Sequence, residues 1–269
     1  MKAGILTFHN AHNYGAALQV LATQTWLTRR GYDCEVINYR INRIDRSYNA
    51  TSAKRKQRFE DFMKKHLNLS PLYKSLAELQ KADLPYDVIV AGSDQIWRPQ
   101  YFFSKIENAY FDFAKDWDVR RIAYATSFGT EEWEYTEEQT NNCAALLKKF
   151  NAVSVRESSA VQLCNDNFGV KAEHVLDPTM LLCKEDYIKL FKDYNAAQSD
   201  GNLFCYILDD GEEKKSIIDC VAKENGLKAF YVNSRYEDLD APLEERIQQP
   251  VEKWLRAFYD AEFLITDSF

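Results

Sequence analysis

The chain has 269 residues and a formal net charge of −7, from 34 Lys and Arg against 41 Asp and Glu. Hydrophobic residues make up 46% and charged residues 28%, a balance that excludes disordered and collagen-like chains and allows a sizeable buried core. The acidic balance argues against nucleic acid as a partner, because that contact depends on clustered Lys and Arg. No run approaches the about 20 apolar residues of a transmembrane segment, and the N-terminus lacks an export signal, so we expect a cytoplasmic protein.

Strands and helices alternate along residues 1–182. The pattern at the N-terminus predicts a strand at 2–8, a helix at 16–30 closed by Gly31, and a strand at 34–39, which together make a βαβ unit. Helices are further predicted at 54–66, 137–150 and 158–170, and strands at 87–92, 120–129, 151–157 and 174–182, the last broken by Pro178. This alternation is typical of a doubly wound α/β domain.

A second alternation covers residues 183–269. Its predicted strands lie at 202–208, 228–233 and 262–269, and its predicted helices at 212–226 and 251–261. We therefore expect an α/β protein with two Rossmann-like lobes, bounded at 1–182 and 183–269. No helix follows the last strand, so the second lobe is expected to be truncated at its C-terminus. Since parallel strands deliver ligand-binding side chains at their carboxyl ends, the segments just after each strand are the candidate sites.

The first candidate segment lies between the first strand and the first helix. Exposed amides and the helix dipole at such a place favour anions, and Asn and His side chains add donors. The segment is neither a GxGxxG sequence nor a P-loop, so the nucleotide fingerprint is absent. The alternative interpretation is an ordinary capped helix start. The residues concerned are His9, Asn10, Asn13, Tyr14 and Gly15.

The second candidate segment follows the apolar strand at 87–92 and contains Ser93, Asp94 and Gln95. Small and polar groups at the carboxyl edge of an open α/β sheet lie where ligands bind. Asp94 is a candidate base, or a group that orients a sugar hydroxyl. The alternative is a turn closed by the hydrogen bond of an Asp side chain to the backbone.

Two further candidates follow strands. Arg156, at the end of the strand at 151–157, can bind a carboxylate or a phosphate through two parallel hydrogen bonds, or else form an ion pair with Glu157 or with the other lobe. Asp267 and Ser268 follow the last strand. The cysteines and histidines show no metal-ligand spacing, so no metal site is predicted.

Six segments follow one another along the chain in this order: GILTFHNAHNYGAALQ, VIVAGSDQIW, RIAYATSFG, VSVRESSAVQL, VLDPTMLL and FLITDSF. In these segments and their order the sequence resembles the polysaccharide pyruvyl transferase family over essentially its whole length. The resemblance implies a GT-B type fold and the transfer of a pyruvyl group from phosphoenolpyruvate to two hydroxyls of a sugar, which forms a cyclic ketal and releases phosphate. It implies no metal and no cofactor, since phosphoenolpyruvate is the donor substrate.

The resemblance also implies roles for single residues. Phosphoenolpyruvate carries a carboxylate and a phosphate, so Arg156 is expected to bind the donor. The acceptor, a cell-surface glycan or its lipid-linked precursor, is expected to meet the N-terminal lobe, and a lipid-linked acceptor implies peripheral contact with the inner membrane face. A histidine that follows the TDSF segment in the family, beyond Phe269 here, is the expected general acid. Within the chain the catalytic candidates are Asp94 and Asp267, and the acceptor candidates are Asn13, Tyr14, Ser93, Asp94 and Gln95.

Two other functions remain open at this point. One is a nucleotide-sugar-dependent glycosyltransferase of the GT-B type, which shares the expected fold, although no nucleotide-binding motif is recognisable in the second lobe. The other is a non-catalytic homologue that binds glycans without turning them over.

Overall fold

The computed structural model describes residues 1–39, 50–82, 84, 86–102, 105–209, 211–232 and 247–268. The chain divides into two compact units, and each is considered by itself. Unit 1 consists of Met1–Asp45 and Met63–Leu182, and unit 2 of Arg46–Phe62 and Cys183–Phe269. A stretch from the N-terminal part of the sequence is thus grouped with the C-terminal part.

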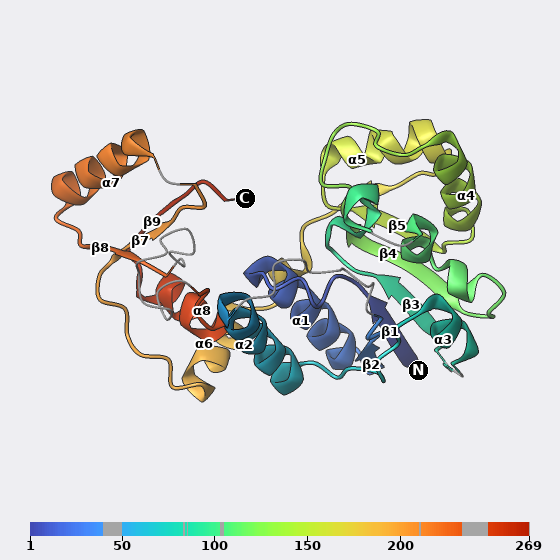
Figure 1. The fold of residues 1–269 in the computed structure, drawn as a ribbon, viewed down its shortest axis with the longest axis horizontal. Helices are drawn as coiled ribbons and strands as arrows, with labels where there is room; N and C mark the ends of the chain where they lie inside the picture. Colours follow the sequence, from blue (N-terminus) through green and yellow to red (C-terminus); the bar gives the residue numbers. More distant parts are fainter. Residues whose placement is uncertain are drawn as a thin grey trace. The chain divides into compact units, whose positions relative to one another are not determined.

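Unit 1 is built on a six-stranded sheet with the strand order β2-β1-β3-β4-β5-β6 (Figure 1). Every pairing among these strands is parallel, which confirms the prediction of an α/β fold with a parallel sheet. The strands are β1 Lys2–Leu6, β2 Asp33–Val36, β3 Val88–Ala91, β4 Arg120–Thr126, β5 Ala152–Val155 and β6 Glu173–His174.

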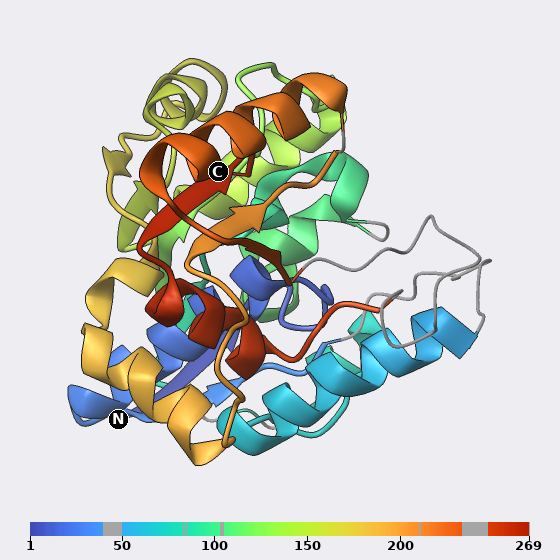
Figure 2. The ribbon, with the colours of Figure 1, turned by 90° about the vertical axis from the view of Figure 1, so that its left-hand side faces the viewer.

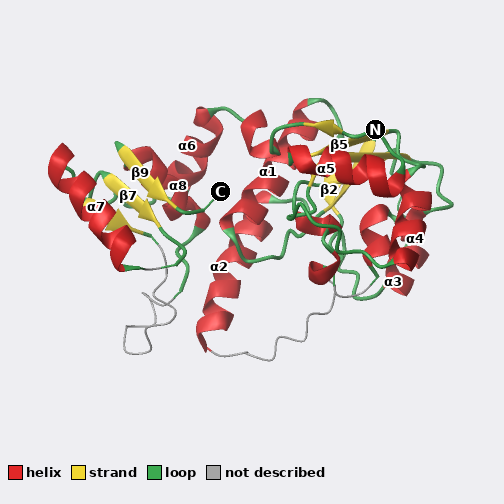
Figure 3. Ribbon diagram, turned by 90° about the horizontal axis from the view of Figure 1, so that it is seen from above, coloured by secondary structure: helices red, strands yellow, loops and turns green. Residues whose placement is uncertain are grey.

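The helices of unit 1 begin and end where local sequence signals place them. Asn13 accepts a hydrogen bond from the Ala16 N–H at 2.6 Å and so caps α1, and Gly31 follows the helix in the left-handed conformation at φ +86°. α1 and α4 lie on opposite sides of the sheet, as a doubly wound topology requires (Figure 3). The helices are α1 Tyr14–Arg29, α3 Leu76–Lys81, α4 Glu137–Leu147 and α5 Ser158–Leu163.

The core of unit 1 is aromatic. Trp97, directly after β3, stacks on Tyr110 with ring centroids 4.9 Å apart, and Phe128, after β4, lies 5.4 Å from Trp97. All three side chains are buried in the same hydrophobic cluster as Ile89 of β3 and Leu147 of α4. The aromatic rings therefore anchor the loops after β3 and β4 in the core. This packing fixes the backbone that carries the polar residues described in the next subsection.

Unit 2 contains a three-stranded parallel sheet with the order β8-β7-β9, formed by β7 Leu203–Tyr206, β8 Ala229–Tyr231 and β9 Phe263–Thr266. One face packs on α7, Glu212–Asn225, and Figure 2 shows that helix lying over the strands. The other face packs on α8, Val251–Asp260. α6, Lys184–Asp193, packs against α8.

α2, Ala50–His66, belongs mainly to unit 2, since the boundary between the units falls at Phe62. In the described part of the chain, no helix combines the length and the apolar character that crossing a bilayer demands.

Candidate functional site

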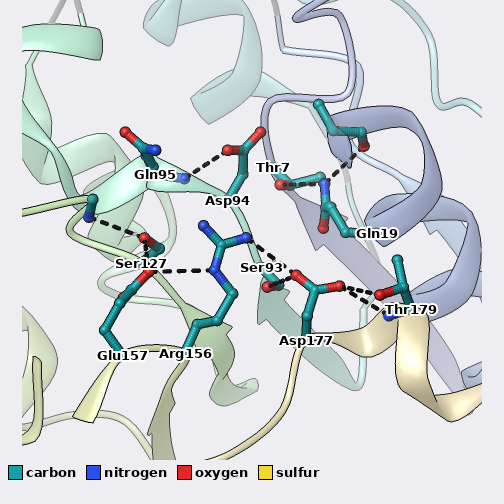
Figure 4. Close-up of polar contacts among 12 residues, drawn as sticks. Thr7, Gln19, Ser93, Asp94, Gln95, Ser127, Arg156, Glu157, Asp177 and Thr179 are labelled. Atoms are coloured by element: carbon teal, nitrogen blue, oxygen red, sulfur yellow. Dashed lines mark hydrogen bonds and ion pairs between the residues drawn. The ribbon is translucent and has the colours of Figure 1, made fainter. Parts of the chain in front are cut away.

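The polar residues that follow β3, β4 and β5 lie together at the carboxyl edge of the sheet in unit 1 (Figure 4). The strand order reverses direction between β1 and β3, and such a switch point is where ligands bind in open α/β sheets. Gly92 allows the segments after β1 and β3 to approach closely, because a Cβ at this residue would stand 2.9 Å from Thr7 Cβ. We refer to these six residues as the carboxyl-edge cluster: Ser93, Asp94, Ser127, Arg156, Glu157 and Asp177.

Arg156 is the central cation of the cluster. Its Nη1 donates to Asp177 Oδ2 at 3.1 Å and its Nε donates to Glu157 Oε1 at 3.3 Å. Burial lowers the pKa of the guanidinium, but the hydrogen bonds and charges of the two carboxylates outweigh burial and raise that pKa above its ordinary value. Nη2 makes no hydrogen bond to another residue that the structure describes, and the side chain is 21% exposed. The ion pair with Glu157 expected as an alternative is thus present, and the Nη2 donors of the guanidinium are left without a partner among the described residues.

Asp177 joins three segments of the chain, although the sequence did not single it out. Its Oδ2 accepts a hydrogen bond from Ser93 Oγ at 2.8 Å as well as the one from Arg156. Its Oδ1 accepts from the Thr179 N–H and from Thr179 Oγ1, each at 2.9 Å. The Asp-Pro-Thr sequence here is a helix-start signal, with Asp177 as the cap and Pro178 in the first position, and it could have identified the residue.

Glu157 is held on one side only. Ser127 Oγ donates to Glu157 Oε1 at 2.6 Å, and Ser127 Oγ in turn accepts from the Gly129 N–H at 3.0 Å. The other oxygen, Oε2, is buried without a hydrogen-bond partner among the described residues. The fully buried Ser127 and Arg156 therefore hold the carboxylate through the same oxygen, Oε1.

A bulge at the end of β4 brings Ser127 into the cluster. Ala125 adopts φ +51°, a left-handed conformation that is costly for a residue with a Cβ, and the pairing register with β5 shifts at this point. Ser154 Oγ stabilises the bulge by accepting from the Ala125 N–H at 3.1 Å and donating to the Ala123 carbonyl at 3.0 Å. The Ser127 N–H can then donate to the Asp94 carbonyl at 3.1 Å, which joins the ends of β3 and β4.

Asp94 is the titratable group of the cluster that is poised near neutrality. Burial raises the pKa of its carboxyl to about 6, against the lowering effects of the Gln95 N–H and the Arg156 charge, and Asp177 raises it further. The Oδ1 atom accepts from the N–H of the next residue, Gln95, at 2.7 Å, and Asp94 thereby caps the 3₁₀ turn Gln95–Trp97. A carboxyl with this pKa can exchange a proton near neutral pH.

The Gln95 side chain lies close to Gly129, which has φ +67°. A Cβ at Gly129 would stand 2.3 Å from Gln95 Oε1, so Gly129→Ala must displace the Gln95 side chain in addition to straining the backbone. We expect Gly129→Ala to lower the free energy of unfolding by about 2–4 kcal/mol. Urea denaturation of the purified variant measures this.

Gly169 provides the matched control, because its φ is +64° and a Cβ at this position would have no atom within 4 Å, so only backbone strain is added. We expect Gly169→Ala to cost about 1 kcal/mol. Adding Gln95→Ala to Gly129→Ala should recover the excess cost. Equal costs for the two glycine variants would contradict the close approach of Gln95.

The first candidate segment has structural contacts of its own. His9 is buried, with Nε2 at a hydrogen-bonding distance of 3.1 Å from Asn38 Oδ1, and Tyr14 is buried at the start of α1. Asn13 caps that helix, as the alternative interpretation holds. Asn10 is half-buried and Gly15 is exposed. Ser93, Asp94 and Arg156 are the predicted residues that the structure brings into one cluster.

Asp267 and Ser268 lie in unit 2. Asp267 Oδ1 accepts from the Leu208 N–H at 2.8 Å, and Oδ2 accepts from Lys214 Nζ at 2.6 Å. The hydrogen bond from Lys214 holds the pKa of Asp267 well below its usual range, so this carboxylate stays ionised. The Ser268 N–H donates to Thr266 Oγ1 at 3.0 Å. Asp267 thus ties the end of β9 to the segment after β7 and has no proton to give near neutral pH.

Within the described ranges, no group of three or more His, Cys, Asp and Glu side chains is placed to hold a metal ion. In the carboxyl-edge cluster, the space that an ion would take between the carboxylates is occupied by the Arg156 guanidinium.

Comparison with known proteins identifies the family. The family model described as polysaccharide pyruvyl transferase matches residues 13–269, which is nearly the whole chain and includes every member of the cluster. No curated protein matches the chain significantly. Because the family model matches nearly the whole chain, the chain belongs to the polysaccharide pyruvyl transferase family, a family of transferases.

Proposed function

We propose that this protein transfers a pyruvyl group from phosphoenolpyruvate to two hydroxyls of a sugar, in a polysaccharide or its precursor, with formation of a cyclic ketal. The family supports a transferase that acts on such an acceptor. One observation carries the proposal further: Arg156, whose Nη2 has no hydrogen-bond partner among the described residues, lies beside Asp94 at the carboxyl edge of the sheet, and burial raises the pKa of Asp94 to about 6.

The chemistry requires both kinds of group. A proton adds to the methylene carbon of phosphoenolpyruvate, and a sugar hydroxyl oxygen bonds to the neighbouring carbon. A second hydroxyl oxygen then bonds to the same carbon as its bond to the phosphate oxygen breaks, so one ketal and one phosphate are formed. The two hydroxyls lose two protons, one of which balances the proton gained by the methylene carbon, while the other leaves with phosphate or enters the solvent.

Arg156 and Asp94 have separate roles in this scheme. The free Nη2 edge of Arg156 binds an anionic group of phosphoenolpyruvate, since charge-assisted hydrogen bonds to carboxylate or phosphate are strong. Ionised Asp94 accepts the proton of an attacking hydroxyl, a task suited to a base that titrates near the working pH. Ser93, fully buried below them, binds Asp177 and keeps the end of β3 in place.

The same proposal includes an arrangement of the two units as GT-B lobes. It also includes a lipid-linked form of the acceptor, which the protein would meet at the inner membrane face. The proposal leaves the identity of the acceptor sugar to experiment.

Phosphate release measures the proposed reaction. The full chain is incubated with phosphoenolpyruvate and a panel of methyl pyranosides and short glycans, and the ketal methyl group is detected by proton NMR. We expect phosphate and ketal in equal amounts. Sugar binding without release would indicate a glycan-binding protein, and stabilisation by nucleoside diphosphates but not by phosphoenolpyruvate would indicate a glycosyltransferase.

A further inference from the structure

Asp177 occupies a place in unit 1 where its side chain can act only through its neighbours. A carboxylate offers about four acceptor sites. All are used, because Ser93 Oγ and Arg156 Nη1 donate to Oδ2 while the N–H and Oγ1 of Thr179 donate to Oδ1. Asp177 therefore has no acceptor site left for a substrate.

The segments that Asp177 joins are far apart in sequence. Ser93 follows β3 and Arg156 follows β5, whereas Thr179 belongs to the 3₁₀ turn Pro178–Leu181, which packs against α1. Figure 4 shows the Asp177 carboxylate between the Arg156 guanidinium and Thr179. A displacement of this carboxylate thus reaches the arginine directly.

Two carboxylates determine how the guanidinium lies. Asp177 engages Nη1 and Glu157 engages Nε, which fixes the plane of the group and leaves the Nη2 edge open. Asp177 is held at both of its oxygens, whereas Glu157 Oε2 has no partner in the described part of the chain. Asp177 is therefore the more firmly held of the two anchors.

We propose that Asp177 is a positioning residue that orients Arg156 for the donor substrate, with Glu157 as its weaker counterpart. The inference rests on the proposed function in that phosphoenolpyruvate is the ligand of Arg156. The guanidinium then presents its Nη2 edge in a fixed direction before the ligand arrives. This lowers the entropy that the Arg156 side chain loses when the ligand binds.

A merely structural role would make a different prediction. Asp177 also caps the turn that contains Thr179, so its loss could act through stability alone. Thr179→Val separates the two roles, because it removes the Oγ1 hydrogen bond to Asp177 and leaves the backbone N–H in place. We expect this variant to be less stable than wild type and to keep the contact between Asp177 and Arg156.

The test is a double-mutant cycle on phosphoenolpyruvate binding, measured by calorimetry, with Asp177→Asn, Arg156→Met and the double variant. We expect Asp177→Asn to weaken binding about tenfold in the wild-type background and less than about twofold in the Arg156→Met background, since the effect passes through Arg156. We expect Thr179→Val to leave the affinity within about twofold of wild type. Equal losses in both backgrounds would overturn the inference.

A second measurement does not depend on the ligand. In the ¹⁵N NMR spectrum of the wild-type chain, we expect separate Nη signals for Arg156 because its guanidinium is held, and a single averaged signal in Asp177→Asn. Arg98, held by Glu134 at 2.8 Å, should be unchanged in both proteins and is the internal control. Separate Arg156 signals in folded Asp177→Asn would overturn the inference, whereas absence of phosphoenolpyruvate binding in the wild type would overturn the proposed function.

Discussion

Asp94→Asn is expected to make the folded protein more stable at about pH 8 and to remove most of its transferase activity. Burial raises the pKa of Asp94 to about 6, whereas an unfolded chain has a value of about 3.9. Between these values the folded state holds a proton that the unfolded state has lost. The contribution of Asp94 to stability is therefore complete below about pH 4 and is lost as the pH rises through about 6, a change of about 2–3 kcal/mol.

An asparagine at this position stays neutral at every pH and can still accept the Gln95 N–H through Oδ1. The variant should therefore escape the loss of stability that the wild type undergoes between about pH 4 and about pH 6. Its turnover should fall by about 10²–10⁴-fold, because an amide cannot take the hydroxyl proton, and wild-type kcat should rise with pH through about 6.

Urea unfolding at about pH 4 and about pH 8 measures the stability effect. Asp166→Asn is the control, because hydrogen bonds from Gln162 and Asn165 lower the pKa of this exposed carboxylate. No gain in stability is expected there. If Asp94→Asn proves less stable than wild type at the higher pH, Asp94 is a structural anion rather than a poised base.

Arg156→Ala is expected to weaken phosphoenolpyruvate binding by about 100-fold. A charge-assisted hydrogen bond contributes about 1.5–3 kcal/mol, and the substitution also leaves Asp177 and Glu157 uncompensated, so that their charges repel an anionic ligand. Arg156→Lys keeps the charge but cannot engage both carboxylates in one plane, so we expect an affinity between those of wild type and Arg156→Ala.

Arg98→Ala is the matched control for loss of a paired arginine. Arg98 donates to Glu134 through Nη2 at 2.8 Å, its side chain is 19% exposed against 21% for Arg156, and it is not part of the carboxyl-edge cluster. Calorimetric titration of Arg98→Ala should give the wild-type affinity for phosphoenolpyruvate. Similar losses in the two alanine variants would show that Arg156 acts through stability and not through ligand contact.

The sequence allowed the strands and the residues that directly follow them to be predicted. β3 is a continuous apolar run, so Asp94 could be placed beyond its carboxyl end. Arg156 could be placed at the end of β5 because the predicted strand there ends at a pair of charged residues. The position of Asn13 at the start of α1 was also predictable, but its side chain caps the helix. Position thus followed from periodicity, and two local partners, Glu157 for Arg156 and the first helix for Asn13, were among the predicted alternatives. The partners distant in sequence were not predicted.

Contacts between distant segments could not be predicted. Asp177 lay within a predicted strand at 174–182, whereas the structure has the short strand β6 followed by a 3₁₀ turn at Pro178. Its hydrogen bond to Ser93 joins residues 84 positions apart, for which no local pattern exists. The bulge at Ala125 likewise carries no sequence signal, because alanine is not a residue that favours a left-handed conformation.

The grouping of Arg46–Phe62 with Cys183–Phe269 has a consequence for biosynthesis. Phe59 and Phe62 are buried in the finished fold, and Arg58 Nη1 donates to the Gln248 carbonyl at 2.8 Å, a partner that leaves the ribosome much later. This stretch of α2 therefore completes its contacts within unit 2 only after Cys183–Phe269 has been synthesised, since translation proceeds slowly compared with local folding.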